Sequence, residues 1–450
     1  MNIGIDAISF DIPKIYLPIK DLAVHRDIAP AKLEKGLGLI KMSFPDIHQD
    51  AVVFAGNALK KLIDDNNIQS QDISRIYVGT ESGVDGSKPI ASFLVSMIED
   101  AVYESGSLDH CDAVDLTFAC IGAVDALQNC CDYVKANPTK KAIVIATDLA
   151  KYDLASPGEY TQGAGAVAML VSSNPRILAF ENTWTVSTAG VFDFFKPRRT
   201  VSKNQLGIQT NESWQEVLET EIEIFKEQPV FDGQYSNKCY VERTNQAYHR
   251  LAERKQGKLH ETWSFIAMHL PYCFQARRMF VEIFISEDET LKKDFEKAVD
   301  KKVFLKKVST SEAYQKFVKE KIYPTEIASG QIGNMYTASI FMALLSALSH
   351  AYKEQNQLTG ETIGFLAYGS GAKSKVFEAV VQPEWQTALK SVELFKTIED
   401  AQAIDVSVYE KLHKKEILDS IKSPKGEFAL IDIETENPLQ LGKRNYQWIS

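Results

Sequence analysis

The stretch Ala142-Ile143-Val144-Ile145-Ala146-Thr147 is an unbroken run of small and β-branched residues. A run this short and continuously apolar is typical of a strand that is covered on both faces, because a half-exposed strand would alternate apolar and polar residues. Residues 164–171 have the same character, and the segment 120–134 before them has a helical pattern. Buried strands separated by helices predict a layered α/β fold.

The same alternation extends outward in both directions and predicts two similar halves. In the first half we expect strands at 3–10, 76–80 and 113–116 and helices at 49–64 and 91–98. In the second half we expect a strand at 265–268, a helix from Phe274, a helix at 334–350 and a strand at 361–368. This repetition suggests an internal duplication, with an N-terminal half at 1–175 and a C-terminal half at 176–450.

Two segments fall outside this pattern. Residues around 200–262 are more polar, and we expect them to be mostly helical, with amphipathic helices at Ser213–Lys226 and Tyr240–Arg254. We interpret 201–228 as an insertion at the surface or at a dimer edge. After Val381 the pattern weakens, which predicts a peripheral C-terminal segment.

Composition excludes several classes of protein. The 50 basic and 60 acidic residues give a net charge of −10 without a dominant basic cluster, so we expect no nucleic-acid partner. We expect no membrane span, because no apolar run reaches the roughly 18–20 residues required, and no signal peptide, because the start lacks basic residues. The six cysteines show no metal-binding or disulfide spacing, which indicates the cytoplasm and no metal site.

Three reactive side chains stand at the ends of predicted strands. Cys120 opens the predicted helix at 120–134, where the helix dipole is expected to favour the thiolate, although most cysteines in apolar segments are inert. Glu81 follows the strand at 76–80. There are two interpretations of a carboxylate in this position: it serves as a general acid or base, or it is an ordinary solvated loop residue. His269 follows its strand in a position that we match to that of Cys120 in the other half. An isolated histidine usually has a structural role. A histidine at such a junction, paired with such a cysteine, has a purely structural role less often.

Glycine-rich turns supply a fourth feature. Gly333-Asn334 begins a predicted helix, and Gly369-Ser370-Gly371 follows a predicted strand. Backbone N–H groups in such turns suit the binding of an oxyanion, and Asn334 can hold a polar group. These turns are therefore candidates for the substrate site.

Taken together, these segments resemble the hydroxymethylglutaryl-CoA synthase family of the thiolase superfamily. The resemblance extends from Met1 to about Val381 and rests on several spaced motifs. These motifs are Asn2-Ile3-Gly4-Ile5-Asp6, Thr80-Glu81-Ser82-Gly83-Val84-Asp85, Phe118-Ala119-Cys120, Thr161-Gln162-Gly163-Ala164-Gly165-Ala166-Val167-Ala168-Met169, Phe192-Asp193-Phe194-Phe195-Lys196-Pro197, Asp232-Gly233-Gln234-Tyr235-Ser236, His269-Leu270-Pro271-Tyr272, Ile332-Gly333-Asn334-Met335-Tyr336-Thr337 and Tyr368-Gly369-Ser370-Gly371.

The resemblance implies a thiolase-like five-layered αβαβα fold, a homodimer and a two-step condensation. Cys120 would accept the acetyl group of acetyl-CoA, and Glu81 would remove a proton from the acetyl methyl. The resulting carbanion would attack acetoacetyl-CoA, whose ketone His269 would polarise, to give 3-hydroxy-3-methylglutaryl-CoA and CoA as in the mevalonate pathway of isoprenoid biosynthesis. Backbone N–H groups of Cys120 and Ser370 would form the oxyanion hole. No metal or prosthetic group would be needed.

The resemblance also implies a substrate site with some departures from the family. Its residues would be Thr161, Ser236, Arg278, Asn334 and Ser370. Ile121 stands where the family commonly has tyrosine, and Phe274 where it usually has lysine. With Phe274 in place of lysine, one positive charge is missing from a CoA contact. Arg277 and Arg278 are the candidates to supply that charge instead.

Three alternatives remain open. One is a ketoacyl synthase or thiolase, for which Cys120, His269 and Asn334 would form the Cys-His-Asn set, although the Glu81 motif argues against it. A second is a synthase of polyketide β-branching, with the same catalytic residues and an acyl carrier protein in place of CoA. The third is a non-catalytic binding protein of the thiolase fold, which the three reactive residues disfavour.

Overall fold

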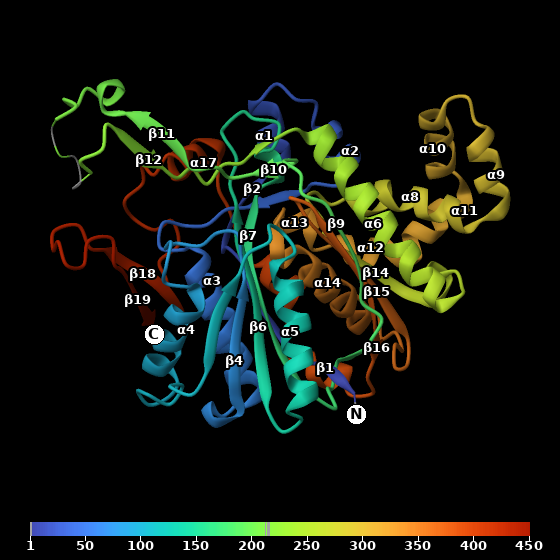
Figure 1. The fold of residues 1–450 in the computed structure, drawn as a ribbon, viewed down its shortest axis with the longest axis horizontal. Helices are drawn as coiled ribbons and strands as arrows, with labels where there is room; N and C mark the ends of the chain where they lie inside the picture. Colours follow the sequence, from blue (N-terminus) through green and yellow to red (C-terminus); the bar gives the residue numbers. More distant parts are fainter. Residues whose placement is uncertain (1, 212, 214–216) are drawn as a thin grey trace.

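A mixed ten-stranded sheet runs through the protein in the computed structural model, which describes residues 2–211, 213 and 217–450 (Figure 1). Its order is β14-β15-β16-β8-β1-β7-β6-β4-β5, with β9 paired to β16. The strands are β1 (Ile3–Asp11), β4 (Ile73–Gly79), β5 (Asp112–Leu116), β6 (Lys141–Ala150), β7 (Gly163–Ser173), β8 (Leu178–Phe180), β9 (Thr185–Thr188), β14 (Trp263–Met268), β15 (Thr362–Gly369) and β16 (Lys373–Val381).

The order of parallel and antiparallel strand pairs in the first half is repeated in the second half. In the first half β4 and β6 are parallel, whereas β6–β7 and β7–β1 are antiparallel. In the second half β14 and β15 are parallel, whereas β15–β16 and β16–β8 are antiparallel. Strand β14 therefore corresponds to β4, so His269 occupies the position of Glu81. The prediction that His269 matches Cys120, which follows β5, is wrong.

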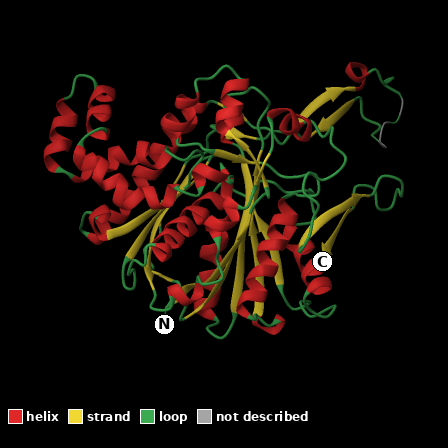
Figure 2. Ribbon diagram, turned by 180° about the vertical axis from the view of Figure 1, so that it is seen from behind, coloured by secondary structure: helices red, strands yellow, loops and turns green. Residues whose placement is uncertain are grey.

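Alternate residues of the strands face different helical layers. Along β6, Val144 packs with the central helices α5 (Gly122–Ala136) and α14 (Ser339–Lys353), and Ile145 packs with the outer helices α3 (Ala51–Asn66) and α4 (Ile90–Ala101). Along β15, Phe365 joins the same central cluster, whereas Leu366 packs with α6 (Gly233–Lys255) and α8 (Gln275–Glu287) on the other outer face. Figure 2 shows helices on both faces of the sheet. The predicted αβαβα arrangement is confirmed.

The polar segment between the halves differs from its prediction. Strands β11 (Arg199–Ser202) and β12 (Glu221–Ile224) pair antiparallel in an arm that projects from the body (Figure 1). The helix predicted over 213–226 is therefore wrong at 221–224, where charged and β-branched residues alternate with the period of a strand. Residues 212 and 214–216 of the arm lie outside the described residues. The helix predicted at 240–254 is confirmed as part of α6.

The helix predicted at 334–350 begins later than expected. A short 3₁₀ turn covers Tyr336–Ala338, and α14 starts at Ser339. Asn334 lies ahead of both, and its side-chain oxygen accepts the backbone N–H of Tyr336 at 2.9 Å. This local bond offers the backbone an alternative to helix, as asparagine side chains commonly do. Asn334 therefore sits in a loop.

Smaller elements cover the edges of the core. The C-terminal hairpin of β18 (Glu427–Ile433) and β19 (Arg444–Ile449) packs on α3 and α4. The other elements are α1 (Ile19–His25), α2 (Pro30–Leu37), α7 (Leu259–Thr262), α9 (Glu289–Lys297), α10 (Lys301–Ser309), α11 (Glu312–Phe317), α12 (Tyr323–Glu326), α13 (Ser329–Ile332), α15 (Trp385–Ala388), α16 (Leu394–Glu399), α17 (Val406–His413), β2 (Ile15–Pro18), β3 (Lys41–Ser43), β10 (Phe194–Phe195), β13 (Val230–Phe231) and β17 (Gln402–Ala403).

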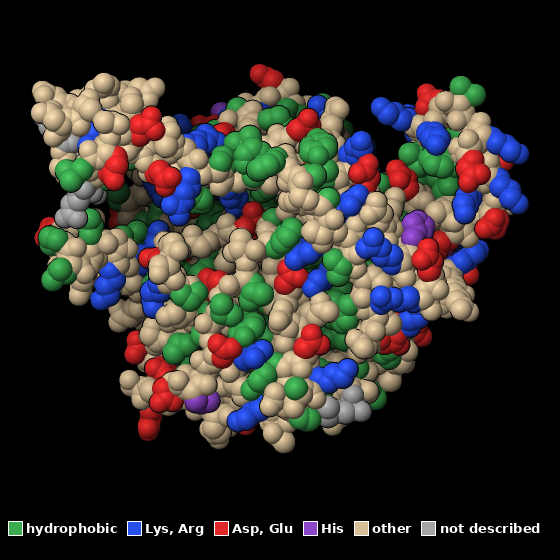
Figure 3. Space-filling view, in the orientation of Figure 1, with side chains coloured by type: hydrophobic (Ala, Val, Ile, Leu, Met, Phe, Trp, Pro, Cys, Tyr) green, Lys and Arg blue, Asp and Glu red, His purple; other side chains and the backbone are tan. Residues whose placement is uncertain are grey.

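Charges on the surface are mixed. Figure 3 shows lysine and arginine side chains interspersed with aspartate and glutamate over the face in view. Among the described residues, no helix is both long enough and apolar enough to cross a bilayer.

Candidate active site

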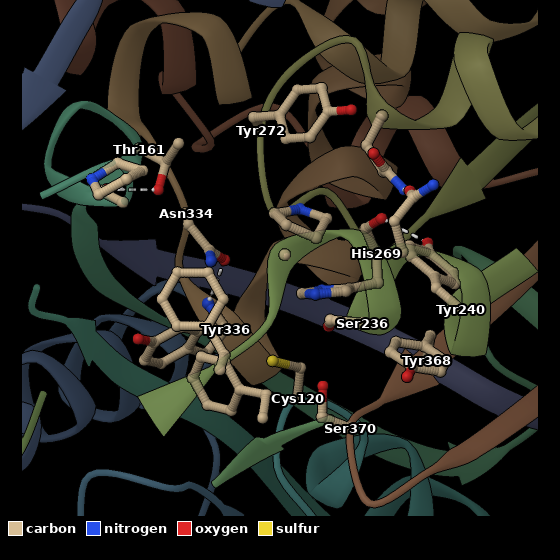
Figure 4. A pocket seen from close by; sticks show the side chains of 18 of the residues that line it. Cys120, Thr161, Ser236, Tyr240, His269, Tyr272, Asn334, Tyr336, Tyr368 and Ser370 are labelled. Atoms are coloured by element: carbon tan, nitrogen blue, oxygen red, sulfur yellow. Dashed lines mark hydrogen bonds between the residues drawn. The ribbon is translucent and has the colours of Figure 1, made fainter. Parts of the chain in front are cut away.

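A cavity of about 310 Å³ lies where the strand ends of the two halves meet. Seven of the eight predicted site residues line it, and the eighth, Glu81, lies behind Cys120 with its side chain 6% exposed. The seven are Cys120, Thr161, Ser236, His269, Arg278, Asn334 and Ser370. Figure 4 shows Cys120, Ser236, His269, Tyr336 and Ser370 around one space. The structure therefore brings all eight residues together.

Cys120 is presented by a tight turn between β5 and α5. Ala119 before it adopts a φ of 39°, in the left-handed region that residues with a Cβ rarely occupy. Gly369, at the end of β15, packs on this turn so closely that a Cβ there would lie 2.7 Å from the carbonyl oxygen of Phe118. This contact sets Ser370, from the second half, beside the nucleophile of the first.

Glu81 connects Cys120 to a buried cation. The Cys120 thiol donates to Oε1 of Glu81 at 3.1 Å. The other carboxylate oxygen, Oε2, lies 3.3 Å from Nζ of Lys196, which also donates to the Glu81 backbone carbonyl. Burial lowers the pKa of Lys196, but the charges of Glu81 and Asp148 outweigh burial and raise it. The site therefore contains a fixed ammonium group next to its carboxylate.

The ionisation of Cys120 differs from the prediction. Burial, and then the charge of Glu81, raise the pKa of the Cys120 thiol well above its usual value, so the resting group is a thiol. The net pKa shift is opposite to the one expected from the helix dipole, because the thiol is buried and a carboxylate contacts it directly, while α5 begins at Gly122, two residues beyond the thiol. Attack by Cys120 therefore requires that its proton be removed.

Asp148 holds the Glu81 loop in place. Its Oδ1 accepts the backbone N–H of Glu81 at 2.8 Å and the hydroxyls of Thr80 and Ser82. Its Oδ2 accepts both the backbone N–H and the hydroxyl of Thr337. Burial and the neighbouring Glu81 raise the pKa of Asp148 to about 6. Five donors on one carboxylate fix the position of Glu81 relative to the second half of the chain.

His269 enters the cavity from the end of β14. It is 2% exposed, and burial lowers its pKa to about 3, so the imidazole is neutral near pH 7. Its Nδ1 lies 2.6 Å from the hydroxyl of Ser339. The other ring nitrogen, Nε2, is on the side of the ring away from this contact. A neutral imidazole at this place can donate to or accept from a ligand, but it carries no charge.

The remaining predicted residues line the walls and the mouth. Thr161 donates to the carbonyl of Gly158 at 2.8 Å, and Ser236 donates to Asp193 at 3.4 Å. Asn334 uses its side-chain oxygen within its own loop, and Ser370 directly follows the end of β15. Arg278 is exposed at the mouth, where its guanidinium donates to the carbonyl of Gly36. Arg278 is thus the cation that a substrate entering the cavity would meet.

Arg277 is not available for the role suggested by its sequence position. Its guanidinium pairs with the buried Glu326 and stacks over the ring of Phe274, 3.7 Å from the ring centroid. The replacement of a basic residue by Phe274 is therefore not compensated by Arg277, whose charge is used inside the protein.

Comparison with known proteins identifies the family. The model for the N-terminal part of hydroxymethylglutaryl-coenzyme A synthase matches residues 1–176, and the model for its C-terminal part matches residues 221–417. The chain belongs to the hydroxymethylglutaryl-CoA synthase family. It is an acyl-transferring condensing enzyme. The segment 177–220, which contains most of the projecting arm, lies between the two matched regions.

Relatives of this family match over nearly the full length. The hydroxymethylglutaryl-CoA synthase of Haloferax volcanii is 30% identical over 465 residues, covering 95% of this chain and 96% of the relative. That of Enterococcus faecalis is 30% identical over 413 residues, covering 92% and 91%. A structure of MvaS in complex with 3-hydroxy-3-methylglutaryl coenzyme A has a TM-score of 0.80 at 26% identity and covers 100% of this chain and 99% of its own. The curacin-pathway HMG synthase shares the fold, with a TM-score of 0.78 at 20% identity over all of both chains.

Four functional residues of this family member escaped the sequence analysis. Lys196 and Asp193 were quoted only as parts of a motif, and Asp148 and Ser339 were not singled out. Asp193 is fully buried and accepts the hydroxyl of Tyr368 and the backbone N–H of Gly371, so it fixes the turn that holds Ser370. A charged residue within an apolar motif, as in Phe194-Phe195-Lys196-Pro197, was the available signal, because buried charges require a partner.

Proposed function

We propose that this enzyme joins acetyl-CoA and acetoacetyl-CoA into 3-hydroxy-3-methylglutaryl-CoA through an acetyl-cysteine intermediate. The observation that carries this proposal is the contact between Cys120 and Glu81 inside the cavity, because it pairs a nucleophile with a base at 3.1 Å. That contact also disfavours the ketoacyl synthase alternative, whose Cys-His-Asn set has no such carboxylate. The names of the relatives at 30% identity support the same reaction.

In the first step the Cys120 sulfur attacks the carbonyl carbon of acetyl-CoA. Glu81 takes the thiol proton, a C–S bond forms, and the CoA thiolate leaves and recovers that proton as free CoA. Transfer of a proton from Cys120 to Glu81 leaves the charge of the buried cluster unchanged, because a thiolate replaces a carboxylate beside the Lys196 ammonium. Proton transfer inside such a cluster avoids the cost of creating a new buried charge.

In the second step Glu81 removes a proton from the acetyl methyl group. The carbon bonds to the ketone carbon of acetoacetyl-CoA, while His269 hydrogen-bonds the ketone oxygen as it gains negative charge. That oxygen is then protonated, which balances the proton taken by Glu81. Water hydrolyses the thioester to Cys120, yielding the product carboxylate and the free thiol.

The other groups take supporting roles in this proposal. Backbone N–H groups of Cys120 and Ser370 stabilise the thioester oxyanion, and Thr161, Ser236 and Asn334 contact the acyl and pantetheine parts. Arg278 contacts the phosphates of CoA at the mouth of the cavity. Thiol, carboxylate and imidazole supply every step, so the proposed reaction uses no metal or prosthetic group. We further propose a cytoplasmic homodimer that serves the mevalonate pathway.

Radiolabelled acetyl-CoA tests the first step. We expect one acetyl group per chain on Cys120 and none on a Cys120→Ala variant, as read by peptide mass spectrometry. A Glu81→Gln variant should lose condensation by at least about 100-fold. An Asp153→Asn variant, which alters a surface carboxylate paired with Lys226, serves as the control. Wild-type protein without an acetylated cysteine would overturn the mechanism.

A carrier protein is the second candidate for the thioester partner. Structures of the curacin-pathway HMG synthase include a complex with an acetyl donor-ACP, and Phe274 and Arg277 leave fewer free cations for CoA at the mouth. Kinetics with acetoacetyl-CoA and with an acetoacetylated carrier protein as acceptors separate the two. We expect a higher kcat/KM with acetoacetyl-CoA, and a preference for the carrier protein would reverse this assignment.

A further inference from the structure

Two lysines of β16 share one carboxylate of α5. Asp125, in the first turn of α5, places its Oδ1 2.7 Å from Nζ of Lys375, and its Oδ2 accepts from Nζ of Lys373. The side chains of Lys375, Lys373 and Asp125 are 10%, 14% and 16% exposed, so water screens their attraction weakly. Lys375 also donates to the side-chain oxygen of Gln128. This ion cluster joins the first half of the chain, which contains α5, to the second half, which contains β16.

The ammonium group of Lys373 has a further contact in the active site. Its Nζ lies over the ring of Phe118, 3.9 Å from the ring centroid. An aromatic face attracts a cation at this distance, and the attraction is stronger where water is excluded. Phe118 stands two residues before Cys120, and Asp125 stands five residues after it. Lys373 therefore contacts both flanks of the nucleophile turn, residues 118–120.

The strand that contains Lys373 begins just after the second turn of the site. Ser370 lies three residues before Lys373, in the turn at 369–371 between β15 and β16. Gly371 of this turn packs on the same aromatic ring, since a Cβ there would lie 3.6 Å from Cε1 of Phe118. The side chain of Lys373 thus extends from the strand beside the Ser370 turn to the nucleophile turn, and these two turns come from different halves of the chain.

We propose that Lys373 is a positioning residue that holds the nucleophile turn against the Ser370 turn and so aligns the backbone N–H groups of Cys120 and Ser370 on the thioester oxyanion. The holding role rests only on the contacts of Lys373 with Asp125 and Phe118, whereas the alignment of the oxyanion hole rests on the proposed function. An oxyanion hole accelerates a reaction only while both donors point at the same oxygen, and a small displacement weakens it steeply. Donors from two halves therefore need a link between the halves.

Hydrogen exchange tests the holding role without any activity. The backbone N–H of Ile121 donates to the carbonyl of Phe118 at 3.1 Å, so its exchange reports opening of the nucleophile turn. We expect this exchange, read by mass spectrometry with fragmentation to single residues, to be faster by at least about tenfold in Lys373→Met. Lys373→Arg should exchange like the wild type, because arginine keeps the charge and stacks on aromatic rings.

Lys375→Met is the matched control. It removes the other cation of the same carboxylate, so Asp125 keeps one ion pair in either variant, but it leaves the contact of Lys373 with Phe118 intact. We expect Lys375→Met to exchange at Ile121 like the wild type. Equal exchange in Lys373→Met and Lys375→Met would overturn the proposal.

Kinetics test the consequence for the oxyanion hole. In Lys373→Met we expect the maximal rate of Cys120 acetylation to fall by at least about tenfold. The acetyl-CoA concentration at half-maximal rate should not change, because Lys373 lies outside the set of described residues that line the cavity. Lys375→Met should acetylate at the wild-type rate, and Lys373→Arg should recover most of the loss.

An infrared band supplies a readout that a loss of stability alone would not move. The carbonyl stretch of ¹³C-labelled acetyl-Cys120 falls in frequency when N–H groups donate to its oxygen. We expect a higher frequency in Lys373→Met than in the wild type and in Lys375→Met. Phe118→Leu, which keeps an apolar side chain but removes the aromatic face, should reproduce the effect of Lys373→Met, and combining the two should add little further loss.

The outcomes separate the two proposals. Equal acetylation rates and equal carbonyl frequencies in Lys373→Met and Lys375→Met would reject the positioning role and keep the proposed function. A wild-type enzyme without acetylated Cys120, together with faster exchange at Ile121 in Lys373→Met alone, would reject the proposed function and keep the holding role of Lys373.

Discussion

The ammonium nitrogen of Lys196 lies 3.3 Å from Oε2 of Glu81, on the far side of the carboxylate from Cys120. The side chains of Lys196 and Glu81 are 11% and 6% exposed, so water screens their attraction weakly. Asp148 adds a second negative charge to the same cluster. Lys196 is the cation that allows two carboxylates and a thiol to share one buried site.

Removal of this cation should impair proton abstraction. In Lys196→Met we expect condensation to fall by about 10- to 100-fold at pH 7, because the base loses its counter-charge, and its acid limb to move to higher pH by about one unit or more, because the charge of Lys196 lowers the pKa of Asp148. Lys196→Arg keeps the charge and should keep the profile. The measurement is kcat for condensation from pH 5 to 9. Lys151→Met, at a cation paired with Glu227 near the surface, is the control, and an unshifted Lys196→Met profile would contradict the prediction.

Acid should inactivate the enzyme through Asp148. Its carboxylate accepts five hydrogen bonds, so protonation below its pKa of about 6 forces at least one donor away and loosens the Glu81 loop. Activity should therefore be present above about pH 6 and lost below it. The Thr337 hydroxyl lowers the pKa of Asp148, so Thr337→Val should move the midpoint upward by about half to one pH unit.

A matched substitution checks this assignment. Thr117→Val removes a nearby hydroxyl that donates to the carbonyl of Thr80 and not to Asp148, so its midpoint should equal that of the wild type. Equal shifts in both variants would show that the acid limb does not report on Asp148.

The loop that carries Asn334 should tolerate no side chain at Gly333. Gly333 has a φ of +98°, and a Cβ there would lie 1.9 Å from the carbonyl oxygen of Gln162. Gly333→Ala should lower the free energy of unfolding by at least about 2 kcal/mol. Gly36→Ala, in α2 with no atom within 4 Å of the added Cβ, should raise it slightly. Urea denaturation measures both, and equal midpoints would refute the close approach.

Two adjacent arginines should give different defects. Arg278 is exposed at the cavity mouth, so Arg278→Ala should raise the KM for acetyl-CoA by about tenfold with little change in kcat. Arg277→Ala should instead lower the free energy of unfolding by about 3 kcal/mol, because it leaves Glu326 buried without its cation. Steady-state kinetics and denaturation of both variants provide the check. A KM effect from Arg277→Ala alone would reverse the assignment.

Local patterns predicted the core but not the arm. The apolar run of β6 identifies a strand covered on both faces, and the structure places helices on each face. Strand β12 escaped prediction because its partner β11 lies some twenty residues upstream, and the pairing that stabilises its alternating Glu-Ile-Glu-Ile pattern is not visible in a local window. A strongly polar segment of this kind was predicted as helix.

The catalytic candidates were found by their places at strand ends, but their ionisation was not. Cys120, Glu81 and His269 each follow a strand, and that rule holds without knowledge of packing. The state of the Cys120 thiol depends on Glu81, 39 residues away, and Lys196 reaches Glu81 across 115 residues. Such contacts require the folded chain, so the thiolate expected from the helix dipole was wrong.

The central helical layer has a consequence for the history of the chain. Helices α5 and α14 are buried between the first-half and second-half parts of the sheet, so each half covers an apolar face of the other. A half-length ancestor with this fold would have needed a second copy of itself to shield that face. Joining two such copies in one chain would turn that contact between subunits into an interior and would fix the ratio of the two halves at one to one. After that, the same strand end could carry a carboxylate in one half and an imidazole in the other.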